Sequence, residues 1–298
     1  MKVLITGANG FLGSHLVKHF KRYTLYTPTR KEVDLRLKEN CKKVVKGMDA
    51  VIHLAANVGG IGYNQQHPAE LFYDNLIMST NLMHEAYLAG VKKYVALGTI
   101  CAYPKYTPVP FKEKDLWMGY PEETNAPYGL AKKMQLVQAQ AYRDQYNFNV
   151  IFLLPVNLYG PRDNFDPESS HVIPALIRKF VEAKRLNLDK VEVWGTGKAT
   201  REFLYVKDAA RGIYLAFKKY NGKEPVNLGS GHEISIKKLV EKIKRLTDYK
   251  GEVVYNTSKP DGQPRRCLDT SKAKEFGFVA KTPFDKGLKE TIKYFKNL

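Results

Sequence analysis

The first thirteen residues constrain the fold more than any other stretch of the chain. They read "MKVLITGANGFLG", so that Gly7, Gly10 and Gly13 stand directly after a short apolar run and directly before an amphipathic stretch. In such a loop one glycine permits a tight turn, one lets the backbone approach a pyrophosphate, and one lets helix and strand pack closely. The free amides at the start of the helix can then bind phosphate groups. The chain therefore begins with a predicted strand, loop and helix that bind a dinucleotide.

Short apolar runs alternate with helical patterns through the first half of the chain. The runs are "KVLIT", "TLYT", "DAVIHLAA" and "KKYVALGT". This alternation is typical of βαβ units and of a parallel sheet with helices on both faces. A later run, "NVIFLLPVN", is apolar on both faces, as a central parallel strand should be. We therefore predict an α/β fold with a Rossmann-type, doubly wound parallel sheet.

The pattern changes after about Asn157. The segment "YGPRDNFDPESSHVIP" is irregular and rich in Pro, Asp and Ser, and long irregular segments of this kind usually build a binding loop or a lid. We predict a smaller α/β substrate-binding lobe beside the sheet. The expected division is a dinucleotide-binding Rossmann domain over 1–157 and 202–225, and a substrate-binding domain over 158–201 and 226–298, with the ligands in the crevice between them.

Composition narrows the possible partners and the compartment. The 298 residues carry a formal net charge of +18, but the lysines are scattered at helical spacing, with no aromatic-rich basic tract. We therefore expect a small polyanionic ligand and no nucleic acid. No apolar run approaches the roughly 18 residues that span a bilayer, so no membrane passage is expected. Cys41, Cys101 and Cys267 form no CxxC pair and are odd in number, which predicts a cytoplasmic protein without disulfides or a metal site.

The end of the second predicted strand distinguishes the two nicotinamide dinucleotides. An acidic residue there would bind the ribose 2′-hydroxyl of NAD. This chain reads "YTPTRKE" instead, and Thr29, Arg30 and Lys31 offer a hydroxyl and two cations that suit a 2′-phosphate. NADPH/NADP is the predicted coenzyme, the alternative being that these residues form an ordinary solvated turn.

A tyrosine and a lysine lie one helical turn apart in "NAPYGLAKKMQLVQAQAYRDQY". Tyr128 and Lys132 should share a helix face, and a neighbouring ammonium lowers the pKa of a phenol, so that it can exchange a proton near neutral pH. The spacing alone often arises by chance. After a dinucleotide loop and a strand that ends at Thr99, it indicates carbonyl and alcohol chemistry. The alternative is a dinucleotide-binding scaffold without enzymatic activity.

The stretch "LGTICAYPK" places a cysteine directly after that strand. Residues two apart in an extended strand end point to the same side, so Thr99 and Cys101 should both face the crevice. A free cysteine is most often only a small buried apolar residue, which is the alternative for Cys101. Cys41 and Cys267 have no chemical context, and we assign them no role. His53, inside the strand "VIHLAA", is predicted to be a hydrogen-bonded core histidine.

The glycine loop, Thr99 and "YGLAK" together resemble the extended short-chain dehydrogenase/reductases that act on nucleotide sugars. The segments "AANVGGIGYNQQHPAELFYDN", "ICAYPK", "NLYGPRDNFDPESSHVIPALIRKF", "VWGTGKATREFLYV" and "SKPDGQPRRCLD" are similar to the GDP-L-fucose synthase family. That resemblance implies an enzyme that inverts C3 and C5 of GDP-4-keto-6-deoxy-D-mannose and then reduces the C4 ketone with NADPH. It also implies a homodimer.

Two alternatives to this reaction stay open. One is the same chemistry on a related GDP-ketosugar, from a GDP-colitose or GDP-6-deoxyheptose pathway, and the other is C4 reduction alone. A 4,6-dehydratase would need an Asp-Glu pair directly after Thr99, where this chain has Ile100 and Cys101.

The resemblance also implies roles for individual residues. Cys101 is the base and His171 the acid of the epimerisation, Thr99 and Tyr128 bind the C4 oxygen, Tyr128 donates the proton of the reduction, and Lys132 binds the nicotinamide ribose. The implied coenzyme contacts are Gly7, Asn9, Gly10, Phe11, Leu12, Gly13, Arg30, Asp34, Leu35, Ala55, Ala56, Tyr128, Lys132, Pro155, Asn157, Leu158 and His171. The implied substrate contacts are Asn157, Val172, Leu176, Lys179, Val193, Trp194, Arg201 and Arg266. Asn9 and Lys179 stand where the family commonly has arginine.

Overall fold

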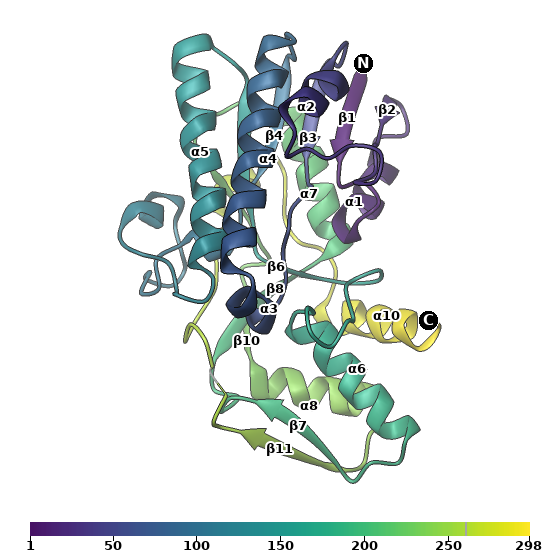
Figure 1. Ribbon diagram of the computed structural model, residues 1–298. Coiled ribbons are helices and arrows are strands. Elements are labelled where there is room, and N and C mark those ends of the chain that lie inside the picture. The colour runs from purple at the N-terminus through teal and green to yellow at the C-terminus, as the bar shows by residue number, and fades with distance from the viewer. Residues whose placement is uncertain (260) are drawn as a thin grey trace.

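A six-stranded parallel sheet forms the centre of the larger part of the molecule (Figure 1). The computed structural model describes residues 1–259 and 261–298. The strands lie in the order β2 (Thr24–Tyr26), β1 (Lys2–Thr6), β3 (Ala50–His53), β4 (Lys93–Leu97), β5 (Val150–Pro155) and β9 (Val226–Leu228). The order reverses at β1, which pairs with β2 on one side and with β3 on the other. Ligands of such sheets bind outside the carboxyl ends of the strands at this reversal.

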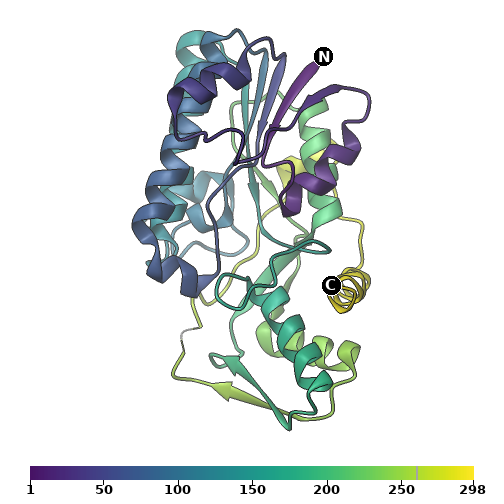
Figure 2. The ribbon, with the colours of Figure 1, turned by 45° about the vertical axis from the view of Figure 1, so that its right-hand side comes forward.

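Helices cover both faces of this sheet, as Figure 2 shows. On one face lie α2 (Lys38–Val45), α4 (Pro68–Leu88) and α5 (Ala126–Tyr146), and on the other α1 (Phe11–Leu16) and α7 (Val206–Lys219). Because both faces are covered, β5 is apolar along its whole length and is buried from Val150 to Leu154. The predicted Rossmann-type, doubly wound sheet is confirmed.

The smaller part of the molecule has its own sheets and its own core. One sheet has the order β10 (Glu233–Ser235), β8 (Thr200–Tyr205) and β6 (Asn157–Tyr159), and a second pairs β11 (Glu252–Asn256) with β7 (Lys190–Trp194). Around them pack α6 (Val172–Arg185), α8 (Ile236–Thr247) and α10 (Phe284–Lys296). The apolar faces of these elements form a second core that includes Phe180, Ile243 and Leu288.

Short helical segments connect the longer elements. They are η1 (Val17–His19), α3 (Ile61–Gln66), η2 (Ile100–Ala102), η3 (Glu113–Trp117) and α9 (Ser271–Glu275). Among the described residues, no helix combines the length and the apolar character that crossing a membrane requires.

Two segments lie on the other side of the predicted domain boundaries. Strand β9, which the sequence division assigned to the second domain, pairs with β5 in the large sheet, and Phe276 and Phe278 pack into the first core. Strand β8, whose residues 202–205 the sequence division assigned to the first domain, pairs with β6 and β10. Strand β9 has only three residues, too few to show a periodic pattern, and its partner β5 lies some seventy residues away in the chain. Local sequence therefore does not reveal to which sheet β9 belongs.

Asn227, on β9, holds the loops behind the crevice. It is fully buried, its Oδ1 accepts a hydrogen bond from the Tyr103 hydroxyl at 2.7 Å, and its Nδ2 donates to the carbonyls of Phe111 at 2.9 Å and Asp269 at 3.0 Å. The fully buried Glu202 accepts the backbone N–H of Leu268 at 2.6 Å. These bonds fix the segment that follows Cys101 and the segment around Arg266 against β9 and β8.

His53, Cys41 and Cys267 are buried outside the crevice. His53 is fully buried between Thr6 Oγ1, at 2.8 Å from its Nδ1, and Ser79 Oγ, at 3.4 Å from its Nε2, and burial lowers its pKa to about 3. The prediction of a hydrogen-bonded core histidine is confirmed. Burial also raises the pKa values of Cys41 and Cys267 to about 12 each.

Candidate active site

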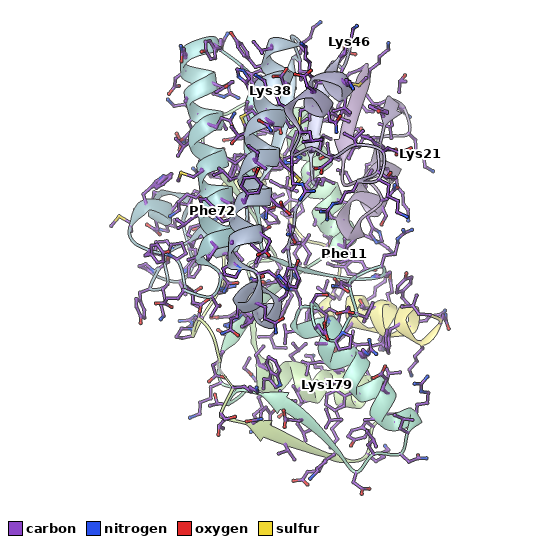
Figure 3. All side chains as sticks on the ribbon, viewed as in Figure 1. Phe11, Lys21, Lys38, Lys46, Phe72 and Lys179 are labelled. Atoms are coloured by element: carbon purple, nitrogen blue, oxygen red, sulfur yellow. The ribbon has the colours of Figure 1, made fainter. Side chains whose placement is uncertain are left out.

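A cleft of about 840 Å³ lies outside the carboxyl ends of β1, β3 and β4 and extends into the smaller part of the molecule. Residues from both parts line it, including Phe11 at the start of α1 and Lys179 on α6, which Figure 3 labels. Every catalytic, coenzyme and substrate contact that the family resemblance implies lines this one cleft. The two parts of the molecule therefore share a single site, at the position that the strand order defines.

The glycine loop has the geometry that its sequence predicts. Gly7 has φ of +71°, a conformation that favours glycine, and a Cβ on it would lie 2.8 Å from the Ala55 nitrogen. A Cβ on Gly13 would lie 2.2 Å from the Gly7 carbonyl oxygen, so only glycine allows α1 to pack this closely on the turn. The cradle beside the loop is therefore open to a pyrophosphate, and the residues fit a dinucleotide.

The loop after β2 differs from its prediction in two details. Thr29 and Arg30 line the cleft, but the exposed Lys31 is not part of its lining. The Thr29 hydroxyl donates to the Glu32 carboxylate at 2.8 Å, so it already has a partner within the protein. Arg30 is therefore the cation of this turn that faces the cleft.

Behind this loop, a network of charged groups ties the chain to α4. Arg36 donates to Asp34 at 2.7 Å and to Asp74 at 3.3 Å, and the Asn57 amide donates to Asp74 at 3.2 Å. Asp74 is almost fully buried. The network fixes the wall of the cleft that carries Asp34 and Leu35.

Thr99 and Cys101 reach the cleft through a turn and not through an extended strand end. Residues 100–102 form η2, and the Thr99 Oγ1 caps it by accepting the Cys101 N–H at 3.2 Å. Helix α5 packs directly on this turn, because a Cβ on Gly129 would lie 2.3 Å from the Cys101 carbonyl oxygen. This packing places Tyr128, the residue before Gly129, next to Thr99 and Cys101.

The environment of Tyr128 contradicts one expectation. Burial raises the pKa of Tyr128 well above its usual value and the Cys101 charge adds to this effect, while a hydrogen bond with Thr99 acts in the opposite direction. Lys132 is not among the causes of this shift, so the prediction that it lowers the pKa of this phenol is wrong in the free protein. Burial also lowers the pKa of Lys132 to about 8, because removal from water disfavours each charged form.

The Cys101 sulfur has two polar neighbours that the sequence did not reveal. Arg266 Nη1 lies 3.6 Å and Asn125 Oδ1 lies 3.8 Å from its Sγ. Arg266 is almost fully buried, and its Nε donates to Gln263 Oε1 at 2.8 Å. The sulfur therefore faces the cleft and does not point into the protein interior.

His171 comes to the cleft from the smaller part of the molecule. It is the residue before α6 and is open to the cleft, but the surrounding protein disfavours its charged form and, together with Arg266, lowers its pKa. The preceding loop meets the glycines after β3, since the Gly60 N–H donates to the Ser169 carbonyl at 2.9 Å. This contact joins the two parts of the molecule at the edge of the cleft.

The far end of the cleft combines apolar surface with cations. Val172, Leu176 and Val193 line it, with the exposed Trp194 beside them. The Lys179 ammonium lies 5.9 Å from the Trp194 ring centroid and donates to the Glu192 carbonyl at 2.9 Å. The Arg201 guanidinium donates to the carbonyls of Thr200 and Asp261, and burial, followed by the Arg266 charge, lowers its pKa to about 9.

Several lining residues escaped prediction because their types carry no chemical signal. Asn57, Asn64, Asn125, Asp261 and Gln263 line the cleft, yet amides and aspartates are common in any loop. Asn125 and Gln263 lie within "NAPY" and "PDGQPRR", so proximity to Tyr128 and Arg266 in the sequence was the one available indication.

Comparisons with known proteins identify the family of this chain. Residues 3–229 match the model of the NAD dependent epimerase/dehydratase family. A protein of Oryza sativa subsp. japonica named probable GDP-L-fucose synthase 1 is 42% identical over 300 residues, covering 99% of this chain and 92% of its own. A GDP-6-OMe-4-keto-L-xylo-heptose reductase from C. jejuni has a TM-score of 0.92 at 30% identity, covering 99% of this chain and 97% of its own.

A third relative contains a bound coenzyme. A GDP-L-fucose synthetase from Naegleria fowleri, solved bound to NADP, has a TM-score of 0.89 at 30% identity, covering 99% of this chain and 94% of its own. The chain belongs to the NAD dependent epimerase/dehydratase family, and within it the similarity to GDP-L-fucose synthases extends over nearly the whole chain.

The contact between α5 and η2 predicts the effect of one substitution. Gly129→Ala should lower the free energy of unfolding by about 1–3 kcal/mol, since the added methyl would overlap the Cys101 carbonyl. Gly62→Ala, also within a helix but with no atom closer than 3.9 Å to the added Cβ, should not lower it. Urea unfolding of both variants would measure the difference, and equal stabilities would contradict the close packing.

Proposed function

We propose that this protein is an NADPH-dependent epimerase/reductase that converts GDP-4-keto-6-deoxy-D-mannose to GDP-L-fucose. The observation that carries the proposal is that Thr99, Cys101, Tyr128 and His171 line one cleft beside a dinucleotide loop. The similarity to proteins named GDP-L-fucose synthase supports the choice of substrate.

The coenzyme would lie along the larger part of the cleft. Gly7, Gly10 and Gly13 leave space for its pyrophosphate, Arg30 faces the position expected for a 2′-phosphate, and NADP is bound in the relative from Naegleria fowleri. The Lys132 side chain is buried in the cleft wall without a hydrogen-bonding partner among the described residues, and can bind ribose hydroxyls. When bound, NADPH supplies a hydride to C4 of the sugar.

The epimerisation uses Cys101 and His171. The Cys101 thiolate removes the proton from C3 or C5, and the electron pair moves to the C4 oxygen. Thr99 and Tyr128 hydrogen-bond this oxygen and stabilise the enolate. The His171 imidazolium then returns a proton to the opposite face, and its lowered pKa makes it the stronger acid. Proton exchange with water restores the thiolate and the imidazolium before the second inversion.

The reduction uses Tyr128. Its raised pKa means that the phenol keeps its proton until negative charge develops on the C4 oxygen, which then receives it. The same oxygen is therefore bound by Thr99 and Tyr128 through all three steps.

The far end of the cleft would bind the GDP part. Lys179 and Arg201 line this end and would neutralise the pyrophosphate. Apolar surface for the guanine would come from Val172, Leu176, Val193 and Trp194. Asn157, whose amide donates to the Glu202 carbonyl at 3.1 Å, would contact the sugar. We infer a coenzyme domain built on the six-stranded sheet, β9 included, and a substrate domain built on the smaller sheets.

We also propose that the protein is a cytoplasmic homodimer. Exposed apolar side chains lie on α4 and α5, among them Phe72, which Figure 3 labels, with Tyr73, Leu88, Val137 and Tyr146. A second copy would cover them. The three free cysteines fit a reducing compartment.

The oligomeric state gives a direct measurement. Light scattering should give twice the chain mass, and Val137→Glu should give the monomer, because the charge would enter an apolar contact. A monomeric mass for the unaltered protein would contradict the proposal.

Product analysis tests the function itself. With GDP-4-keto-6-deoxy-D-mannose and NADPH in deuterated water, NMR should show GDP-L-fucose carrying deuterium at C3 and C5. A product reduced at C4 without that deuterium would favour the alternative of reduction alone, which the similarity to a heptose reductase supports. If this substrate is not turned over but a related GDP-ketosugar reacts, the related sugar is the substrate and the proposal of GDP-L-fucose synthesis is wrong.

Two substitutions should separate the two reactions. Cys101→Ser should slow deuterium wash-in at C3 and C5 by at least about 100-fold, because a serine hydroxyl is a far weaker base than a thiolate. Tyr128→Phe should slow the oxidation of NADPH by a similar factor and leave wash-in measurable. Unchanged wash-in in the cysteine variant would exclude Cys101 as the base.

A further inference from the structure

The Cys101 sulfur lies between a group that can only donate a hydrogen bond and a group that can only accept one. Arg266 Nη1 is 3.6 Å from Sγ and Asn125 Oδ1 is 3.8 Å from it. A guanidinium has donors alone, and an amide oxygen has only acceptor sites. A thiolate at this position can accept from Arg266, and a thiol can donate its S–H to Asn125.

The Arg266 side chain is fixed relative to the cysteine turn. Its Nε donates to Gln263 Oε1 at 2.8 Å, and Gln263 in turn donates to the carbonyls of Pro104 at 3.2 Å and Lys105 at 2.7 Å. Both side chains are more than nine-tenths buried. Among the described residues, no carboxylate forms an ion pair with Arg266, so its charge is available to the sulfur.

The Asn125 amide is fixed just as closely. Its Nδ2 donates to the buried Glu122 carboxylate and, at 3.2 Å, to Thr124 Oγ1. Its Oδ1 accepts from Asn64 Nδ2, also at 3.2 Å. Because the amide nitrogen already has an anionic acceptor, the oxygen is the atom that faces the sulfur.

We propose that Arg266 and Asn125 act through Cys101 as positioning residues, Arg266 stabilising the thiolate and Asn125 accepting the hydrogen bond of the thiol. When the thiolate removes a proton, the S–H bond forms, the C–H bond breaks, and its electrons move to the C4 oxygen. That the proton comes from a sugar carbon rests on the proposed function, whereas the contact between Arg266 and the Cys101 thiolate does not. Arg266 thereby takes a different role from the substrate contact that the family resemblance implied.

Other charged groups also face this sulfur. Tyr128 approaches it from α5 and Arg201 from β8, while Glu122 stands behind Asn125 and His171 is close enough to Arg266 to feel its charge. The Arg201 hydrogen bonds go to the carbonyls of Thr200 and Asp261 and not to the sulfur. Arg201 is therefore the matched control, as a second cation of the same site without the sulfur contact.

Alkylation of Cys101 by iodoacetamide in the substrate-free protein tests the proposal, with peptide mass spectrometry to isolate this cysteine. Arg266→Gln should slow alkylation at pH 7 about ten-fold and move the pH–rate curve to higher pH, because one nearby charge shifts an ionisation by a unit or more. Arg266→Lys should restore most of the rate. Asn125→Ala should move the curve to lower pH, since the thiol alone loses a hydrogen bond.

The outcomes that would overturn the proposal are equally specific. If the pH–rate curve of Cys101 alkylation is the same in Arg266→Gln as in the wild type, the contact does not stabilise the thiolate. The same conclusion follows if Arg201→Gln displaces that curve as far as Arg266→Gln does. If Arg266 instead binds pyrophosphate, Arg266→Gln would raise KM for the GDP-sugar while alkylation stays unchanged. Alkylation needs no substrate, so failure of the proposed function would leave this result interpretable.

Discussion

The contact of α5 with the turn after β4 is the constraint on which the rest of the site depends. Gly129 lets the helix approach the Cys101 carbonyl to a distance that no other residue permits. Tyr128 and Lys132 enter the cleft because they belong to that helix, and Thr99 and Cys101 because they belong to that turn. One backbone contact therefore sets the mutual position of four side chains that come from two segments of the chain.

Local sequence predicted the elements that a single segment determines. The glycine loop, the parallel strands and the core position of His53 follow from spacing and hydrophobic pattern, and each is present as expected. The pattern did not predict η2, because a threonine that caps a short helix, as Thr99 does, cannot be distinguished in the sequence from a threonine at the end of a strand. It also missed β9, whose three residues acquire their structure from pairing with β5.

The chemistry of the cleft was less predictable than its location. The raised pKa of Tyr128 results from burial, which depends on everything packed around the phenol and not on the lysine one turn away. In the same way, Arg266 and Asn125 reach the sulfur from segments 165 and 24 residues away in the chain. Sequence spacing within one helix indicates which side chains can lie close together. Their pKa values depend on burial and on side chains from distant segments of the chain.

The guanidiniums of Arg201 and Arg266 lie in the same cleft and affect the free protein. Arg201 and Arg266 repel each other there, and carbonyl and amide oxygens provide less compensation than a carboxylate would. The folded chain thus carries unbalanced positive charge at this end of the cleft, and a diphosphate bound by Arg201 would reduce it. Binding of a nucleotide sugar in the cleft should therefore raise the melting temperature of the protein. The substrate that begins catalysis would thus also protect the protein from unfolding in the cell.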